Sequence, residues 1–291
     1  MKDFEYAAPR SVGEAISLLA EKGSRAMVLA GGTDILVQLR SGRRTVDRLV
    51  DAKNIPETNE ISYTPQDGLQ LGASVPCCRI YQNAAVSEAY PGLIDCAALI
   101  GGIQIQGRAS LGGNLCNAAP SADGIPPLIV LGATCQVAGP NGTRTVAAED
   151  FCTAPGQNVL EDGEFLVAIH LPPPVAHSGA HYLRFIPRNE MDIAVAGVGS
   201  SVVLDASGKS FVSARVSLAS VAPTPLYVKE AGDALAGKEV SDDAIEEAAE
   251  AAMAAAKPIA DMRGTIPQRK HLVGVLTRRT LKGAIDRARE A

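Results

Sequence analysis

The sequence lacks the features of a nucleic-acid-binding, membrane-spanning or secreted protein. Its formal net charge is -5, so it offers no excess of basic side chains for a polyanion. It contains no run of about eighteen apolar residues, the length that a bilayer-spanning helix needs. The N-terminus, Met1-Lys2-Asp3-Phe4, has neither the basic start nor the apolar core of a signal peptide. These absences favour a cytoplasmic location.

Metal-binding and nucleotide-binding patterns are missing too. The six cysteines, at positions 77, 78, 96, 116, 135 and 152, include no CxxC pair, and the four histidines are scattered. We therefore expect packing thiols, no metal site and no Cys-His nucleophile. The P-loop pattern GxxxxGK[ST] and the dinucleotide pattern GxGxxG are also absent, which argues against nucleotide kinases and simple NAD enzymes.

The chain is long and apolar enough for about two domains. It has 291 residues, of which 46% are hydrophobic, enough to fill ordinary cores. Helix and strand patterns alternate over the first sixty residues, and mixed patterns follow. Pro172-Pro173-Pro174 favours an extended segment and is the clearest candidate domain boundary.

Local patterns predict the elements on either side of this boundary. Before the prolines we expect a helix capped by Ser11 with Glu14, strands at 27–30, 49–52 and 164–171, a helix at 34–40, and hairpins across Asp67-Gly68 and Asn141-Gly142. After them we expect strands at 181–186, 193–204 and 211–219, then a helix from Ser241 to Pro258 and another at 268–289. The last helix carries five basic residues: Arg278, Arg279, Lys282, Arg287 and Arg289. We expect them to form either a solvated face or a surface for an acidic partner.

Two glycine-rich turns carry most of the functional information. They are Ala30-Gly31-Gly32-Thr33-Asp34, and Ala109-Ser110-Leu111-Gly112-Gly113-Asn114. Paired glycines let backbone N–H groups converge on an anion, and the strand, turn and helix order of the first aims a helix dipole at it. One such turn could simply lead a strand into a helix. Two together favour a ligand gripped at its diphosphate from both sides.

At these residues the chain resembles a known family, the FAD-binding medium subunit of molybdenum hydroxylases, which includes the carbon monoxide dehydrogenase and xanthine dehydrogenase group. The resemblance runs the full length. Besides the two turns, it includes Phe4-Glu5-Tyr6 with Pro9, Pro120 and Asp123, the Leu166 strand ending at Pro172, and the segment 188–194.

The resemblance implies an α+β fold in two parts. Residues 1–174 would form a two-lobed FAD-binding domain of the vanillyl-alcohol-oxidase (PCMH) type, with lobes at about 1–55 and 56–174. Residues 175–291 would form a small C-terminal α+β domain with a three-stranded sheet. The elements predicted from local patterns, and the boundary predicted at Pro172-Pro173-Pro174, agree with this division into two parts.

The resemblance also assigns cofactor-binding residues. The first lobe would wrap the diphosphate with Val28, Leu29, Ala30, Gly31, Gly32, Thr33, Asp34 and Ile35, and the second would grip it with Ser110, Gly112, Gly113 and Asn114. Asp123 would hold a ribose hydroxyl. Arg184 would approach the pyrimidine edge of the flavin, Ile193 would cover one face of the isoalloxazine, and Leu166 would line the flavin or adenine environment. Ile100 stands where xanthine dehydrogenases often have an aromatic residue for the adenine.

Simpler interpretations of several of these residues stay open at this point. Asp123 could cap the helix that follows it, and Arg184 could be a solvent-side charge on a strand. Ile100, Leu166 and Ile193 are apolar and would be core residues in any fold.

The implied function needs no catalytic residue in this chain. A large partner would hold a molybdenum cofactor and a small partner would hold two-iron two-sulfur clusters, with FAD here passing electrons to an external acceptor. The complex would be a dimer of heterotrimers. Two alternatives are a stand-alone flavin-dependent oxidoreductase of the same fold and a non-catalytic assembly module.

Overall fold

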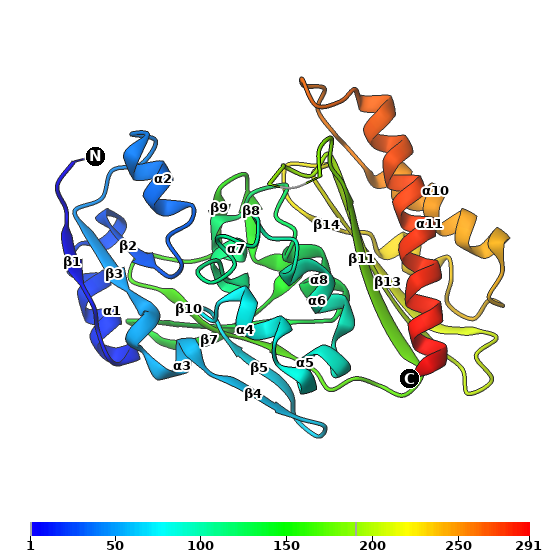
Figure 1. The fold of residues 1–291 in the computed structure, drawn as a ribbon, viewed down its shortest axis with the longest axis horizontal. Helices are drawn as coiled ribbons and strands as arrows, with labels where there is room; N and C mark the ends of the chain where they lie inside the picture. Colours follow the sequence, from blue (N-terminus) through cyan, green and yellow to red (C-terminus); the bar gives the residue numbers. More distant parts are fainter. Residues whose placement is uncertain (1, 190) are drawn as a thin grey trace.

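The computed structural model describes residues 2–189 and 191–291. Glu190, which belongs to the 188–194 segment of the resemblance, lies outside the described residues. Figure 1 shows an N-terminal lobe at one end, a central sheet with short helices, and a sheet covered by two long helices at the other end.

The N-terminal lobe is built on a three-stranded parallel sheet. Its order is β1 (Glu5–Ala7), β3 (Arg48–Asp51), β2 (Ala26–Leu29). The helical elements are α1 (Val12–Ala20), η1 (Gly23–Arg25) and α2 (Ile35–Arg40). The predicted cap of α1 is confirmed, because Ser11 Oγ accepts the Glu14 N–H at 3.2 Å. Since the strands are parallel, their carboxyl ends share one edge, and the first glycine turn leaves β2 there.

The central part holds a five-stranded antiparallel sheet. Its order is β4 (Ile61–Thr64), β5 (Gly68–Gly72), β10 (Phe165–Leu171), β6 (Thr134–Gly139), β7 (Gly142–Ala147), which confirms both predicted hairpins. Its helices are η2 (Ala52–Asn54), α3 (Pro56–Asn59), α4 (Cys77–Tyr81), α5 (Ala84–Ala89), α6 (Pro91–Ala97), α7 (Leu111–Asn117), α8 (Ile125–Val130) and η3 (Ala148–Asp150). A small hairpin joins β8 (Cys152–Ala154) and β9 (Gln157–Asn158). The largest core cluster lies between this sheet and its helices.

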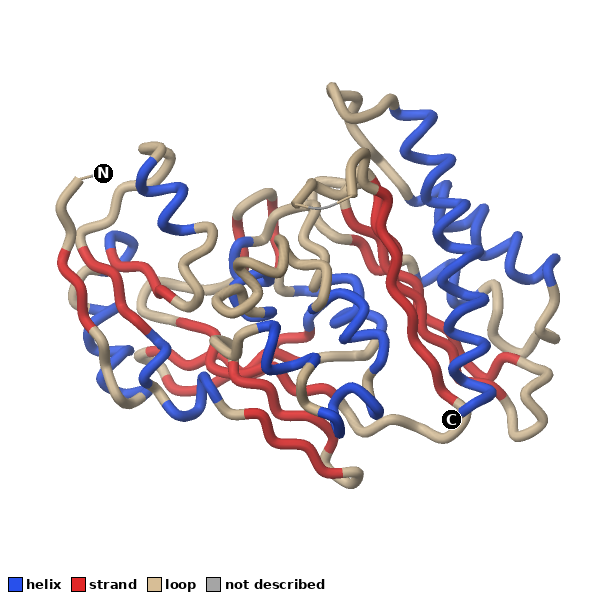
Figure 2. The backbone as a smooth tube through the Cα atoms, in the orientation of Figure 1, coloured by secondary structure: helices blue, strands red, loops and turns tan. Residues whose placement is uncertain are grey.

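The C-terminal part is an antiparallel sheet with its helices on the outer face (Figure 2). The three predicted strands are confirmed as β11 (Ser178–Phe185), β12 (Ala196–Leu204) and β13 (Phe211–Ala219), and a two-residue strand, β14 (Leu226–Tyr227), adds a fourth. The helices are α9 (Lys229–Asp233), α10 (Asp242–Ala255) and α11 (Ile266–Glu290). Because α11 packs across β11 and β12, the sheet is buried between this helix and the central part.

Ion pairs account for most of the basic residues of α11. Arg278 pairs with Glu246, and Lys282 pairs with Asp242. Arg287 reaches α6 of the central part, where both of its terminal nitrogens bind Asp95, at 2.6 and 2.9 Å. This bidentate pair holds the C-terminal helix against the central part of the molecule.

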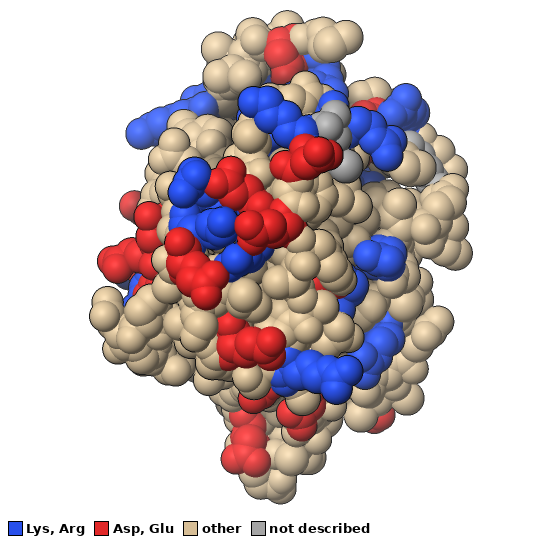
Figure 3. Space-filling model, turned by 90° about the vertical axis from the view of Figure 1, so that its left-hand side faces the viewer, with Lys and Arg blue, Asp and Glu red and all other residues tan. Residues whose placement is uncertain are grey.

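Charges of both signs also alternate on the face at the N-terminal end of the molecule (Figure 3). In that lobe Arg48 pairs with Glu5 and with Glu21. None of the helices among the described residues has the length and hydropathy needed to span a bilayer.

Candidate functional site

The first glycine turn presents a row of free backbone donors. Gly32 has φ +81°, in the left-handed region that glycine adopts without strain. The N–H groups of Gly31, Gly32, Thr33 and Asp34 have no backbone acceptor within residues 2–189 and 191–291. Successive N–H groups beside a left-handed residue form a concave anion-binding site. These four N–H groups, which we call the cradle, could therefore hold an anion at the carboxyl end of β2.

Three apolar residues that flank this turn anchor it through their side chains. Leu29 and Ile35 pack in a small core cluster with Leu39 and Leu49, and Val28 packs against a second cluster. Asp34 precedes α2 without capping it, and desolvation raises the pKa of its carboxyl group although the side chain is exposed.

The second glycine segment begins a helix, although the sequence predicted only a turn. Ser110 is the N-cap of α7, and its Oγ accepts the Gly113 N–H at 3.0 Å. This bond occupies the Gly113 donor that the resemblance directs at the diphosphate. The Gly112 N–H has no acceptor in the described part of the chain. Asn114 Oδ1 accepts the Gly124 N–H at 2.9 Å, so the side-chain amide nitrogen is the part of Asn114 left for a ligand.

The two segments meet backbone to backbone. A Cβ atom at Gly31 would lie 1.9 Å from the carbonyl oxygen of Arg108, just before the second segment. A Cβ at Gly112 would lie 2.4 Å from the Ala73 carbonyl oxygen, so this glycine is also required by packing. At Gly113 the nearest atom is Ser110 Oγ, at 3.0 Å, and the site is otherwise open. The contact of Gly31 with Arg108 therefore brings the first turn next to the residues that lead into the second segment.

Lys53 contacts the backbone of the first turn, a role that the sequence patterns did not predict. Lys53 Nζ donates to the carbonyl oxygen of Ala30 at 3.0 Å and pairs with Asp51 at 2.6 Å. The sequence does contain a signal for this pair, because Asp51 ends a buried strand at the same sheet edge as the turn. Lys53 brings positive charge to the backbone of the cradle.

Asp123 and Arg184 form a buried pair where the two parts of the molecule join. Asp123 accepts from Arg184 Nη1 at 2.5 Å and from the Tyr182 hydroxyl at 2.7 Å. Burial raises the pKa of Asp123, opposed by the charge of Arg184 and the Tyr182 bond. Asp123 does not cap α8, and Arg184 is not a solvent-side charge, so both simpler interpretations are wrong.

This pair leaves one donor available at the domain junction. Arg184 Nε is buried and has no hydrogen-bond partner among the residues described. A buried N–H without a partner is costly. A ligand oxygen or nitrogen at this junction would satisfy it.

The three apolar candidates fall into two groups. The side chains of Ile100 and Leu166 are buried in the central core cluster, with Leu166 opposite Val137 on β6, as the simpler interpretation expects. Ile193 is 49% exposed, in the loop before β12, and the core interpretation is wrong for it. Through Met191 the same loop approaches Gly102, where an added Cβ would lie 2.7 Å from Met191 Cγ.

The cysteines behave as packing residues. All six thiols are free. Burial raises the pKa of Cys77 and of Cys135 to about 12. These two thiols are therefore protonated and weakly nucleophilic near neutral pH.

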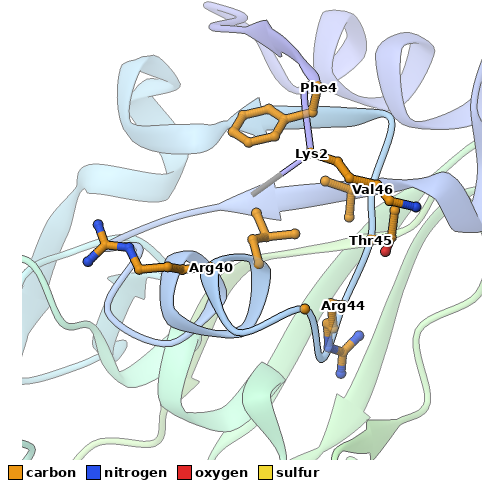
Figure 4. A pocket seen from close by; sticks show the side chains of 8 residues that line it. Lys2, Phe4, Arg40, Arg44, Thr45 and Val46 are labelled. Atoms are coloured by element: carbon orange, nitrogen blue, oxygen red, sulfur yellow. The ribbon is translucent and has the colours of Figure 1, made fainter.

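A separate pocket of about 380 Å³ lies at the carboxyl end of α2 (Figure 4). Phe4, Leu39 and Val46 give it apolar walls, and its cationic side chains are those of Lys2, Arg40 and Arg44. Neither glycine segment lines it, so it is distinct from the cradle.

Comparison with known proteins matches both parts of the chain to one family. Residues 2–174 match the family described as the FAD binding domain in molybdopterin dehydrogenase, and residues 181–284 match the CO dehydrogenase flavoprotein C-terminal domain. The chain therefore belongs to the FAD-binding subunits of molybdenum-containing dehydrogenases.

Individual relatives cover nearly the whole chain. The xanthine dehydrogenase FAD-binding subunit of Escherichia coli O157:H7 is 31% identical over 290 residues, covering 99% of this chain and 98% of the relative. The carbon monoxide dehydrogenase medium chain of Hydrogenophaga pseudoflava is 33% identical over 283 residues, covering 97% and 96%. A solved structure of carbon monoxide dehydrogenase from Hydrogenophaga pseudoflava superposes with a TM-score of 0.93 at 32% identity, covering 98% of each chain.

Proposed function

We propose that this chain binds one FAD across the two glycine segments and passes electrons from an iron–sulfur partner to an external acceptor. The main support is the contact of Gly31 with the Arg108 carbonyl. It brings the free N–H groups of the first turn close to the residues that lead into α7. The four N–H groups of the first turn, with the Gly112 N–H and the Asn114 amide nitrogen of the second segment, suit a diphosphate, which carries negative charge on several oxygens.

The remaining roles follow from the chemistry of each group. Backbone N–H groups at Gly31 to Asp34 and at Gly112 would hold the diphosphate, and Arg184 Nε would donate to the bound cofactor at the domain junction. Ile193, exposed in the loop before β12, would cover a face of the flavin ring. Bound FAD supplies one-electron and two-electron chemistry. The protein binds and orients it, and no side chain of the site is assigned a proton transfer.

The partner subunits are proposed from the relatives' names. A medium chain and an FAD-binding subunit are parts of larger enzymes, and a stand-alone oxidoreductase or a non-catalytic module is not favoured. We propose a large molybdopterin-binding subunit and a small subunit with two-iron two-sulfur clusters, arranged as a dimer of heterotrimers. Six free thiols suit a reducing compartment and support a cytoplasmic location.

Co-purification tests this function. A tagged chain, purified from its native host, is expected to bring down two partners together with molybdenum, iron and FAD, each measured on the same sample. A solitary yellow protein with full substrate-oxidising activity would overturn the subunit assignment. A colourless chain with both partners attached would overturn the FAD assignment.

A further inference from the structure

Three side-chain contacts connect the parallel sheet to the backbone of the first glycine turn. Lys53 Nζ donates to the Ala30 carbonyl oxygen at 3.0 Å and to Asp51 Oδ1 at 2.6 Å. The other oxygen of Asp51 accepts the Tyr6 hydroxyl at 2.5 Å. Tyr6 lies on β1, Asp51 ends β3 and Ala30 follows β2, so the network joins all three strands.

The carboxylate at the centre of this network is held ionised. Asp51 is only 4% exposed, and burial alone would raise its pKa. Hydrogen bonds from the Lys53 ammonium, the Tyr6 hydroxyl and the Lys53 backbone N–H outweigh burial and bring the pKa of Asp51 below its ordinary value. A fixed carboxylate therefore orients the lysine, and the lysine is left to bind the turn.

The bond to Ala30 determines where the next N–H points. In a planar trans peptide the C=O and the following N–H point in opposite directions. Because the Ala30 carbonyl faces Lys53, the Gly31 N–H faces away from it. On its Cα side, Gly31 lies against the Arg108 carbonyl. The first donor of the cradle is therefore oriented before an anion arrives, which lowers the cost of binding.

We propose that Lys53 is a positioning residue for the diphosphate of the cofactor, and that Asp51 and Tyr6 hold it in place. This inference rests on the proposed function. It predicts that Lys53 matters for ligands that carry the diphosphate and not for the flavin ring alone.

The test compares three ligands on the full-length chain freed of cofactor: FAD, ADP and riboflavin. In Lys53→Met we expect FAD and ADP affinities to fall about tenfold or more, the loss of one charge-assisted hydrogen bond, and riboflavin affinity to stay unchanged. The matched control is Lys22→Met, which removes a lysine of the same lobe that pairs with Glu5 at 3.1 Å instead of the turn. It is expected to bind all three ligands as the parent does.

A milder variant keeps the test decisive if Lys53→Met folds poorly. Tyr6→Phe removes only the hydroxyl that bonds Asp51, and it should weaken FAD and ADP, but not riboflavin, by a smaller factor. Parent-like FAD affinity in Lys53→Met overturns the inference. So does an equal loss for all three ligands together with a lower melting temperature, because that pattern indicates a merely structural role. A parent chain that binds no FAD overturns the proposed function instead.

Discussion

Gly31 and Arg108 are in backbone contact, although 77 positions separate them in the chain: a Cβ on Gly31 would lie 1.9 Å from the Arg108 carbonyl oxygen and 2.5 Å from its carbon. Backbone atoms cannot move aside as a flexible side chain can. This contact fixes how closely the first glycine turn approaches the residues that lead into the second segment.

Gly31→Ala is therefore expected to separate the two segments. We expect a loss of about 1–3 kcal/mol in the free energy of unfolding, the usual range for overpacking, together with loss of bound FAD. Urea denaturation and flavin absorbance measure the two effects. Gly107→Ala is the control, because an added Cβ there meets nothing within 4 Å. Parent-like FAD content in Gly31→Ala would contradict the role given to this contact.

Substitutions at Gly112 and Gly113 are expected to have different effects, one on stability and the other on FAD binding. Gly113→Leu fills the open side of the site, where the nearest atom is Ser110 Oγ at 3.0 Å, and should abolish FAD retention while the fold persists. Gly112→Ala forces a Cβ to within 2.4 Å of the Ala73 carbonyl and should lower the melting temperature. Circular dichroism and extracted flavin distinguish them. Normal FAD content in Gly113→Leu would count against the second segment as a binding element.

Breaking the buried pair should make stability depend on pH. Arg184→Met leaves Asp123 buried without its cation, a change that typically costs about 3–5 kcal/mol. The pKa of Asp123 is already raised by burial and should rise further. An acid whose pKa is raised in the folded state stabilises the fold when it is protonated. The stability that Arg184→Met loses should therefore be largest at high pH, and the loss should shrink as pH falls through the raised pKa of Asp123.

Urea denaturation at several pH values measures that deficit. Lys282→Met is the control, because its partner Asp242 is exposed and exposed ion pairs contribute little. A deficit that stays constant from acid to neutral pH would contradict the assignment of Asp123 as the group left unpaired.

His181 is expected to give a second, opposite pH dependence. Burial lowers its pKa from the ordinary value of 6.5. The folded state then prefers neutral histidine, so this contribution is fully present above pH 6.5 and is lost as pH falls through the lowered pKa. His181→Gln should flatten the stability profile over that range in chemical denaturation. His271→Gln, at an exposed position of α11, should leave the profile as it is.

The sequence predicted those features of the site that are formed by residues close together in the chain. Gly31-Gly32 could be recognised because strand, glycine pair and helix follow one another within a few residues, and the structure places them in that order. The second segment was predicted as a turn because its paired glycines suit the convergence of backbone N–H groups, and two glycines also disfavour helix. In the structure the Ser110 cap and the packing of Gly112 against Ala73 override that preference.

The contacts that complete the site connect residues far apart in the chain. Asp123 and Arg184 were both selected, but their pairing joins the segment before α8 to β11 and could not be predicted from either segment alone. Lys53 was missed because its role depends on Ala30, 23 positions earlier, and on the parallel register of β2 with β3. Sequence patterns identify elements and glycine turns, whereas the partners of charged side chains require the tertiary arrangement.

A crystal structure of the full-length chain loaded with FAD is the most direct test of the account. We expect the diphosphate oxygens to lie within hydrogen-bond distance of the backbone nitrogens of Gly31 to Asp34, with the start of α7 on the other side. A diphosphate bound elsewhere, for example among Lys2, Arg40 and Arg44 at the far end of α2, would contradict it.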